Sequence, residues 1–316
     1  MAFELPKVTY TGRIREVTIG TGERAVTVGG ESCYPFHTFE GEIPHPPRIA
    51  MEVFDHVDPE EWSEPALEPF RDVIGDPAAW AQKCVQEYGA ELIAVQLVSI
   101  DPNGLNRPAE EAVETVRKVV EAVDVPVIVW GCGDEEKDAE ALRLVAEACE
   151  GRRLAIGPVV EGNYKQLGAT CIAYNHVAIA STPIDINLAK QLNILLGDLG
   201  VPDDRIIMDP TTGGLGYGIE YTYSVMERIR IAALTQQDEK LAYPMICNMG
   251  VEVWKVKEAK LREEEAPELG DLKRRAVMME AITAKLLLLA GADILIMHHP
   301  EAVELTRGML EELLAT

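Results

Sequence analysis

Short apolar runs alternate with amphipathic stretches along most of the chain. From residue 48 onward, eight runs are almost continuously apolar: residues 48–55, 91–99, 125–132, 154–159, 176–182, 205–212, 244–250 and 292–299. Continuous rather than alternating hydrophobicity is typical of parallel strands that are covered on both faces. The pattern therefore predicts eight buried parallel strands.

Helical patterns separate these runs. In residues 108–123, Ala112, Val116, Val119, Val120 and Val123 recur at the spacing of one buried helix stripe. Similar patterns cover residues 135–150, 185–199, 271–290 and 300–314. Eight strand–helix units in series favour an α/β fold of the closed (β/α)8 TIM-barrel type, and an open eight-stranded sheet is the alternative.

Residues 1–47 stand outside this repeat. Apolar residues at 15–20 and 24–28, separated by a turn that contains glycine, predict a β-hairpin that caps the bottom of the barrel. Because no Pro/Ser-rich linker is visible, we assign residues 1–47 to an N-terminal extension and residues 48–316 to one barrel domain. The segment 251–268 is rich in Lys and Glu, and we expect an extended, exposed excursion at the rim.

Composition narrows the function. The 316 residues carry a net charge of −24, which argues against binding to nucleic acid or to anionic membrane surfaces. Residues 1–10 lack the pattern of a signal peptide, and the longest apolar run, residues 281–292, is too short to span a bilayer, so we expect a cytoplasmic protein with no membrane partner. No two of the six cysteines form a CxxC pair, so zinc-ribbon and iron–sulfur signatures are absent.

Ligands of such barrels bind at the C-terminal ends of the strands. The most informative segment runs RIIMDPTTGGLGYG, where a strand leads into Asp209, two threonines and four glycines. Glycines let a backbone approach a ligand closely, although a glycine-rich turn can also merely fit a tight space. Other polar residues at predicted strand ends are Glu52, Asp55, Gln96, Asp101, Asn163, Thr182, Asp185, Asn187, Asn248, His298 and His299.

These polar residues do not form an evident catalytic set. Glu52 and Asp55 are either an acid/base pair or a salt bridge at the rim. His298 and His299 point to opposite faces of their strand, so we expect hydrogen bonds to a neighbouring loop rather than a metal pair. We expect no catalytic residue and no metal ligand in this chain.

Four segments together carry a resemblance to a known family. They are IIMDPTTGGLGYG, RIAMEVFD, STPIDINLAKQLN and ILIMHHPEA. The chain resembles, over its whole length, the small (delta) subunit of the corrinoid iron–sulfur protein of the carbon monoxide dehydrogenase/acetyl-CoA synthase (Wood–Ljungdahl) pathway of carbon dioxide fixation. It is also similar to pterin-binding barrels, including dihydropteroate synthase and methyltetrahydrofolate methyltransferase.

The resemblance implies a heterodimer with a large subunit that carries a [4Fe–4S] cluster and a cobalamin-binding domain. The barrel mouth would cover the corrinoid, whose cobalt passes a methyl group from methyltetrahydrofolate, through a separate methyltransferase, to acetyl-CoA synthase. None of the six histidines lies in an Asp-x-His-x-x-Gly corrinoid motif, so the cofactor would be shared with the large subunit. The residues expected to face it are Asp209, Thr211, Thr212, Gly213, Gly214, Asn248 and Met249, followed by Asp185 and Asn187.

Two other interpretations stay open. The Asp-Pro turn and its glycines favour a folate- or pterin-binding methyltransferase, or an enzyme similar to dihydropteroate synthase. Against it, such sites carry basic side chains for anionic groups, and the sequence shows no comparable basic set near the mouth. A barrel that serves only as a scaffold is the third interpretation.

Overall fold

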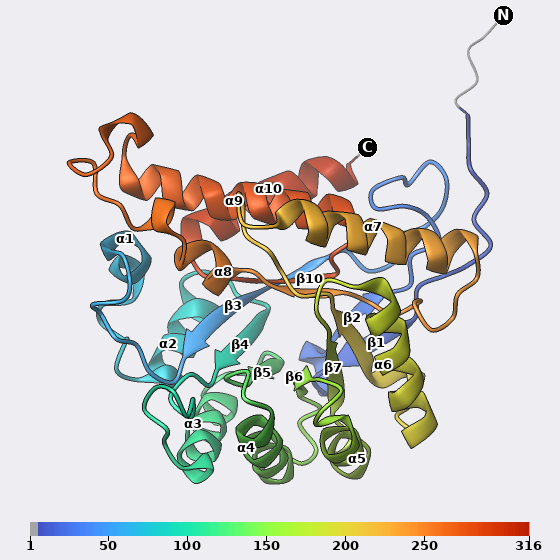
Figure 1. Ribbon diagram of the computed structural model, residues 1–316, viewed down its shortest axis with the longest axis horizontal. Helices are drawn as coiled ribbons and strands as arrows, with labels where there is room; N and C mark the ends of the chain where they lie inside the picture. Colours follow the sequence, from blue (N-terminus) through green and yellow to red (C-terminus); the bar gives the residue numbers. More distant parts are fainter. Residues whose placement is uncertain (1–5, 316) are drawn as a thin grey trace, which may run out of the picture.

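A barrel of eight parallel strands forms the centre of the molecule, as the sequence predicts (Figure 1). The structure, a computed structural model, describes residues 6–315. The strands are β3 (Arg48–Phe54), β4 (Leu92–Gln96), β5 (Val127–Trp130), β6 (Ala155–Val159), β7 (Val177–Ser181), β8 (Ile206–Asp209), β9 (Ile246–Asn248) and β10 (Ile294–Met297). Their order is β8-β7-β6-β5-β4-β3-β10-β9. A parallel bridge between Met208 and Met245 closes the ring, so the alternative of an open sheet is wrong.

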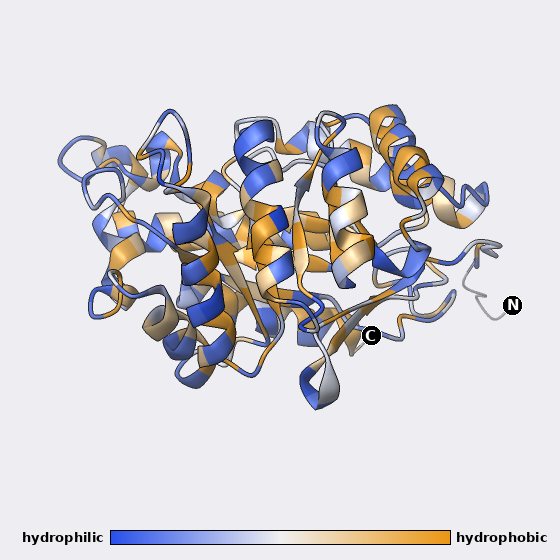
Figure 2. Ribbon diagram, turned by 90° about the horizontal axis from the view of Figure 1, so that it is seen from below, coloured by the Kyte–Doolittle hydropathy of each residue, from blue (hydrophilic) through white to orange (hydrophobic). Residues whose placement is uncertain are grey.

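Helices cover the outside of the barrel. They are α1 (Glu64–Leu67), α2 (Pro77–Gln86), α3 (Ala109–Ala122), α4 (Glu135–Ala148), α5 (Tyr164–Tyr174), α6 (Ile186–Leu199), α7 (Ile219–Thr235), α8 (Gly250–Trp254), α9 (Leu272–Ala290) and α10 (Pro300–Leu314). Figure 2 shows the apolar strands between helices whose outer surfaces are largely hydrophilic. The five helices predicted from periodicity are confirmed as α3, α4, α6, α9 and α10.

Alternation along the strands divides the barrel interior into layers. The lower part of the interior is apolar and contains residues such as Ala94, Ile128, Ile207 and Ile296. Two residues further along their strands come polar side chains, because every second residue points to the same side. This polar layer at the C-terminal ends consists of Glu52, Gln96, Ser181, Asp209, Asn248 and His298.

The predicted hairpin closes the other end of the barrel. Strands β1 (Glu16–Ile19) and β2 (Val26–Gly29) pair in antiparallel fashion, and Val17, Ile19, Val26 and Val28 pack against the interior residues of the barrel. Arg153, just before β6, donates a 2.7 Å hydrogen bond from Nε to the carbonyl of Thr18. Packing and hydrogen bonding thus fix the hairpin as a plug, which confirms the predicted cap.

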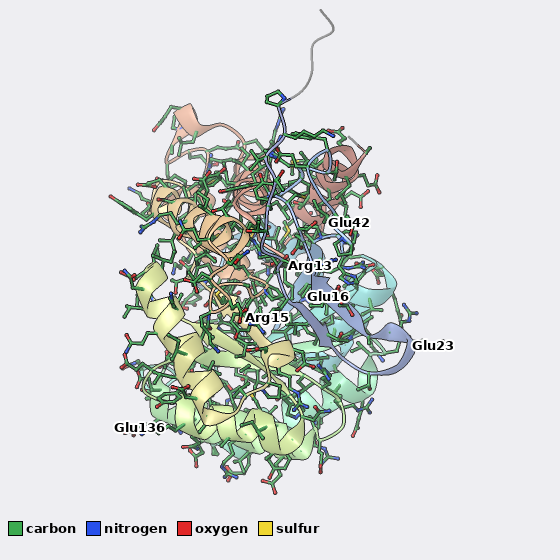
Figure 3. The ribbon with its side chains drawn as sticks, turned by 90° about the vertical axis from the view of Figure 1, so that its right-hand side faces the viewer. Arg13, Arg15, Glu16, Glu23, Glu42 and Glu136 are labelled. Atoms are coloured by element: carbon green, nitrogen blue, oxygen red, sulfur yellow. The ribbon has the colours of Figure 1, made fainter. Side chains whose placement is uncertain are left out.

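One ion pair joins the extension to the barrel, and a second charged contact lies within the extension itself. Arg15 forms an ion pair with Asp203, and Arg13 lies 4.0 Å from Glu42. Figure 3 shows Arg13 and Glu42 near each other, with Glu23 at the outer turn of the hairpin. Residues 1–5, which belong to the predicted extension and to the segment searched for a signal peptide, lie outside the described residues.

The segment after β9 differs from the sequence-based expectation. We predicted an exposed excursion over residues 251–268, but this segment begins with α8 and buries Val253, Trp254, Val256, Ala259 and Ala266. The prediction is wrong for these five apolar residues, whereas residues 262–265 are exposed as expected. Within residues 6–315, no helix has both the length and the apolar character required to cross a bilayer.

Candidate functional site at the barrel mouth

Asp209 ends β8 and lies buried under the glycine-rich loop. Ser181 at the end of β7 donates a 2.8 Å hydrogen bond to Oδ2, and the backbone N–H of Thr211 donates to Oδ1 at 3.0 Å. Burial raises the pKa of the Asp209 carboxyl to about 6, although these two hydrogen bonds act in the opposite direction. Asp209 can therefore exchange a proton near neutral pH.

The loop after Asp209 folds back on itself. Thr211 adopts a left-handed conformation with φ 60° and donates from its hydroxyl to the carbonyl of Thr182 at 2.6 Å. The N–H of Gly213 donates to the hydroxyl of Thr222 at 2.9 Å. A Cβ atom on Gly213 would lie 2.7 Å from the carbonyl carbon of Gly218, so only glycine fits there. Gly214 is also buried within this turn.

Two buried hydroxyls near this loop have no partner. Oγ1 of Thr182 and Oγ1 of Thr212 are both shielded from solvent, and neither forms a hydrogen bond within residues 6–315. A buried hydroxyl without a partner is unfavourable. The hydroxyl of Thr212 lies close to the buried thiol of Cys247.

Asn248 ends β9, next to β8, and pairs across the barrel with Gln96 at the end of β4. Nε2 of Gln96 donates to Oδ1 of Asn248 at 2.8 Å, and Nδ2 of Asn248 donates back to Oε1 of Gln96 at 3.3 Å. Asn248 is half-buried and is the part of this pair nearest to solvent. The side chain of Met249 is fully buried in the core.

Asp185 and Asn187 lie at the start of α6. The Asp185 carboxylate accepts hydrogen bonds from the N–H groups of Asn187 at 2.7 Å and Leu188 at 3.1 Å, so it caps the helix. Asn187 is exposed. No described hydrogen bond joins these two residues to Asp209.

A buried charge cluster lies directly behind Gln96. Nε2 of Gln96 also donates to Oε2 of Glu52 at 3.3 Å, and Nδ1 of His298 lies 3.0 Å from Oε1 of Glu52. Nε2 of His298 lies 2.9 Å from the carbonyl oxygen of Ala66. Nδ1 is within ion-pair distance of the carboxylate and Nε2 is within hydrogen-bond distance of a carbonyl, and both contacts favour the protonated imidazole. Burial alone would lower the pKa of His298, but Glu52 and the nearby Glu280 raise it above its ordinary value.

Glu280, in the middle of α9, completes this cluster. Its carboxylate accepts hydrogen bonds from the N–H of His298 at 2.5 Å, the N–H of His299 at 3.1 Å and Nε1 of Trp254 at 2.8 Å. Burial raises the pKa of Glu280 to about 7. No local pattern marks Glu280 as a site residue, because it lies within a helix rather than at a strand end.

The contacts of His298, Glu52 and Asp55 differ in how far they agree with the sequence analysis. His298 is within hydrogen-bond distance of Ala66 in α1, the short helix after β3, rather than of a loop as expected. Glu52 and Asp55 form neither of the arrangements considered: Glu52 pairs with His298, whereas Asp55 accepts hydrogen bonds from the N–H groups of Val98 and Ser99. The acid/base pair and the rim salt bridge are both wrong, because the partners of Glu52 and Asp55 lie on segments that are distant in sequence.

A cavity of about 490 Å³ opens beside the charge cluster. Rings of Phe54, Trp62 and Trp254 form part of its wall, and Lys255 and Lys260 also line it. Two lysines therefore reach this part of the mouth, although the sequence analysis did not single them out. The residues of the glycine-rich loop do not line this cavity, so the mouth has two regions, one at β8 and one beside β3 and β4.

The comparisons with known proteins agree with this fold. Solved structures of dihydropteroate synthase share it: the enzyme from Xanthomonas albilineans in complex with indole-2-carboxylic acid and 6-chloroguanine superimposes with a TM-score of 0.60 at 15% identity, over 95% of this chain and 98% of that one. The enzyme from Thermus thermophilus, in complex with 4-aminobenzoate, gives a TM-score of 0.57 at 14% identity, over 94% and 99% of the two chains. At this identity the likeness shows the fold alone.

Sequence relatives are more specific. The acetyl-CoA decarbonylase/synthase complex subunit delta of Archaeoglobus fulgidus is 38% identical over 98% of this chain and 71% of its own length. The subunit of the same name from Methanopyrus kandleri is 39% identical over 92% of this chain and 71% of its own length. The model of the CO dehydrogenase/acetyl-CoA synthase delta subunit family matches residues 16–310. The chain therefore belongs to the CO dehydrogenase/acetyl-CoA synthase delta subunit family.

Proposed function

We propose that this chain is the non-catalytic small subunit of a heterodimeric corrinoid iron–sulfur methyl carrier. In this proposal its barrel mouth covers a corrinoid (cobalamin) that the large subunit anchors. The bound corrinoid supplies a cobalt centre that carries the methyl group from methyltetrahydrofolate, by way of a methyltransferase, to acetyl-CoA synthase. Membership of a family of complex subunits supports the carrier role, and the chemistry of the mouth supports the covering role.

The observation that carries the proposal is the mixture of groups at the mouth. Val98, Leu105 and Tyr217 are large apolar side chains that remain exposed on the loops after β4 and β8. The buried hydroxyls of Thr182 and Thr212 lie on the loops that follow β7 and β8. A corrin ring has an apolar face and a periphery of amide groups, so apolar contacts and hydroxyl donors fit it well.

The chain's own residues would then exclude water and hold the ring by hydrogen bonds. Asn248 can turn its amide from Gln96 toward a ligand, while Asp209, whose pKa lies near 6, can donate or accept a proton. Covering the ring with apolar side chains removes water from a reactive centre. We assign the [4Fe–4S] cluster to the large subunit, because the six cysteines here lie in separate segments of the chain and five of them are buried.

Co-expression with the large subunit tests this proposal. The complex is separated by size exclusion, and its absorption spectrum and cobalt content are measured. A 1:1 complex that contains cobalt, with no cobalt on this chain alone, is the expected result. A colourless monomer that ignores the large subunit would exclude the carrier role.

A folate- or pterin-binding enzyme is the second candidate. The position of Asp209 at a strand end, and the lysines beside the aromatic cavity, favour it. Calorimetric titration of the isolated chain with methyltetrahydrofolate separates the two. Binding by the isolated barrel, followed by turnover without a corrinoid subunit, would support the enzyme instead of the carrier.

A further inference from the structure

Helix α9 presents an apolar stripe to solvent. Met278, Ile282 and Leu289 are exposed, with exposed fractions of 43%, 45% and 36%. Arg274 and Lys285 lie on the same stripe, because residues 274, 278, 282, 285 and 289 follow one face of an α-helix. The stripe is roughly 22 Å long at 1.5 Å per residue.

The opposite face of α9 is already used. Ala276, Val277, Ala281, Ala284, Leu287 and Leu288 are buried against the barrel and its neighbouring helices. The exposed stripe is therefore not a core face left partly open at its edge. Single exposed apolar residues are ordinary on protein surfaces, but a contiguous stripe of them marks an interaction site.

The charge of this helix is opposite to that of the chain. The sequence LKRRAVMMEAITAKLLLLA contains four basic residues and one acidic residue, and the acidic residue, Glu280, is fully buried. Lys273 pairs with Glu68 and Glu301, and Arg275 donates to backbone carbonyls. Arg274 and Lys285 form no ion pair within residues 6–315. The stripe is thus apolar and cationic on a molecule whose net charge is −24.

We propose that this α9 stripe is the apolar centre of the interface with the large subunit, which would present an apolar helix face flanked by carboxylates. The inference rests on the proposed heterodimer and names the surface that forms it. Charge complementarity selects the partner: two copies of this chain joined through α9 would place two cationic stripes together, whereas carboxylates would neutralise Arg274 and Lys285. An interface of standard size also needs a polar rim around such a centre.

The test uses the full chain co-expressed with the large subunit. The double variant Met278→Glu/Ile282→Glu places two carboxylates in the apolar centre, and we expect heterodimer affinity to fall by roughly a hundredfold or more. Arg274→Glu/Lys285→Glu reverses the charge without removing an apolar side chain. It is expected to weaken association about tenfold and to change its dependence on salt.

Ile172→Glu provides the matched control. Ile172 on α5 is 38% exposed, and α5 lies on the other side of the barrel from α9 (Figure 1). All variants alter exposed side chains, so their circular dichroism and melting temperature should match the wild type. Affinity is measured by sedimentation velocity at several protein concentrations, with cobalt analysis of the complex.

Each result has a definite meaning. Weaker heterodimer association in both α9 variants, with wild-type affinity in Ile172→Glu, supports the α9 interface. A cobalt-containing heterodimer that forms equally well with all variants overturns the α9 interface and leaves the carrier role intact. Self-association of the isolated chain that only the α9 variants abolish would assign the stripe to a second copy and overturn the partner proposed here. If the wild type forms no complex with the large subunit, the carrier role fails, and the partner assigned to α9 fails with it.

Discussion

The Glu52–His298 pair gives the sharpest test of the barrel interior. Both side chains are fully buried, and the cation of His298 also donates to the carbonyl of Ala66. Glu52→Leu removes the carboxylate paired with the buried imidazole of His298. Conversely, His298→Leu leaves a buried carboxylate that, among the described residues, keeps its hydrogen bond from Gln96. Removal of one partner of a buried ion pair costs about 3–5 kcal/mol of unfolding free energy.

The double variant Glu52→Leu/His298→Leu should be much less damaging than the sum of the two. It removes both charges, and its remaining penalty is the loss of hydrogen bonds to Gln96 and Ala66, about 2–3 kcal/mol together. The expected coupling between the two sites is therefore at least about 3 kcal/mol. Because the pKa of His298 is raised in the folded protein, the pair stabilises fully below pH 6.5. Its contribution is lost as the pH rises through the folded pKa of His298.

Urea unfolding at pH 6 and pH 9 measures this coupling. Fluorescence of Trp62 and Trp254 reports on the site, because their rings lie 4.9 Å and 5.6 Å from the His298 ring. Coupling of at least about 3 kcal/mol at pH 6, and less at pH 9, is predicted. Additivity of the two single variants within about 0.5 kcal/mol would refute a charged pair.

Three further predictions follow from the mouth. Gly213→Ala should destabilise the protein by about 1–3 kcal/mol, because the new methyl group meets the backbone of Gly218. Thermal melting measures this effect, and an unchanged melting temperature would contradict the tight turn. In the wild type, the free energy of unfolding should fall by up to about 3 kcal/mol between pH 4 and pH 7, because a carboxyl with a raised pKa is stabilising only while protonated. Asp209→Asn should abolish this fall. If the pH profile of unfolding is the same in the variant and the wild type, a pKa near 6 is contradicted. Glu280→Gln should destabilise the protein by about 2–3 kcal/mol, because an amide nitrogen replaces one of the two oxygens that accept hydrogen bonds from His298, His299 and Trp254. A midpoint of urea unfolding equal to that of the wild type would show that these three donors do not need both oxygens.

The sequence predicts the barrel well because parallel strands buried on both faces leave an unmistakable apolar signature. Each of the eight predicted runs contains one observed strand, and the observed strands are shorter because several runs continue into the polar layer or the following loop. The polar ends of β3, β4 and β8 were also identified as candidates. Local patterns do not predict which of these strand ends lie in contact, since hydrogen bonds such as Gln96–Asn248 join residues 152 positions apart.

Other parts of the site could not be predicted from local pattern. Glu280 belongs to a helix, where an acidic residue is usually exposed. Its burial is possible because donors from His298, His299 and Trp254 surround its carboxylate. Trp254 sits in a segment whose charge suggested an exposed loop. The inward orientation of His298 could have been inferred, because counting back by two along its strand reaches the interior residues Ile296 and Ile294.

Hydrogen–deuterium exchange tests most directly whether the mouth covers the corrinoid. The isolated chain is compared with the cobalt-containing heterodimer, and with the heterodimer prepared without corrinoid. Cofactor-dependent protection is predicted in the loops after β4, β7, β8 and β9, that is, in residues 97–106, 182–185, 210–218 and 249–256. Cofactor-dependent protection confined to the hairpin end, or the absence of any in these loops, would contradict the account.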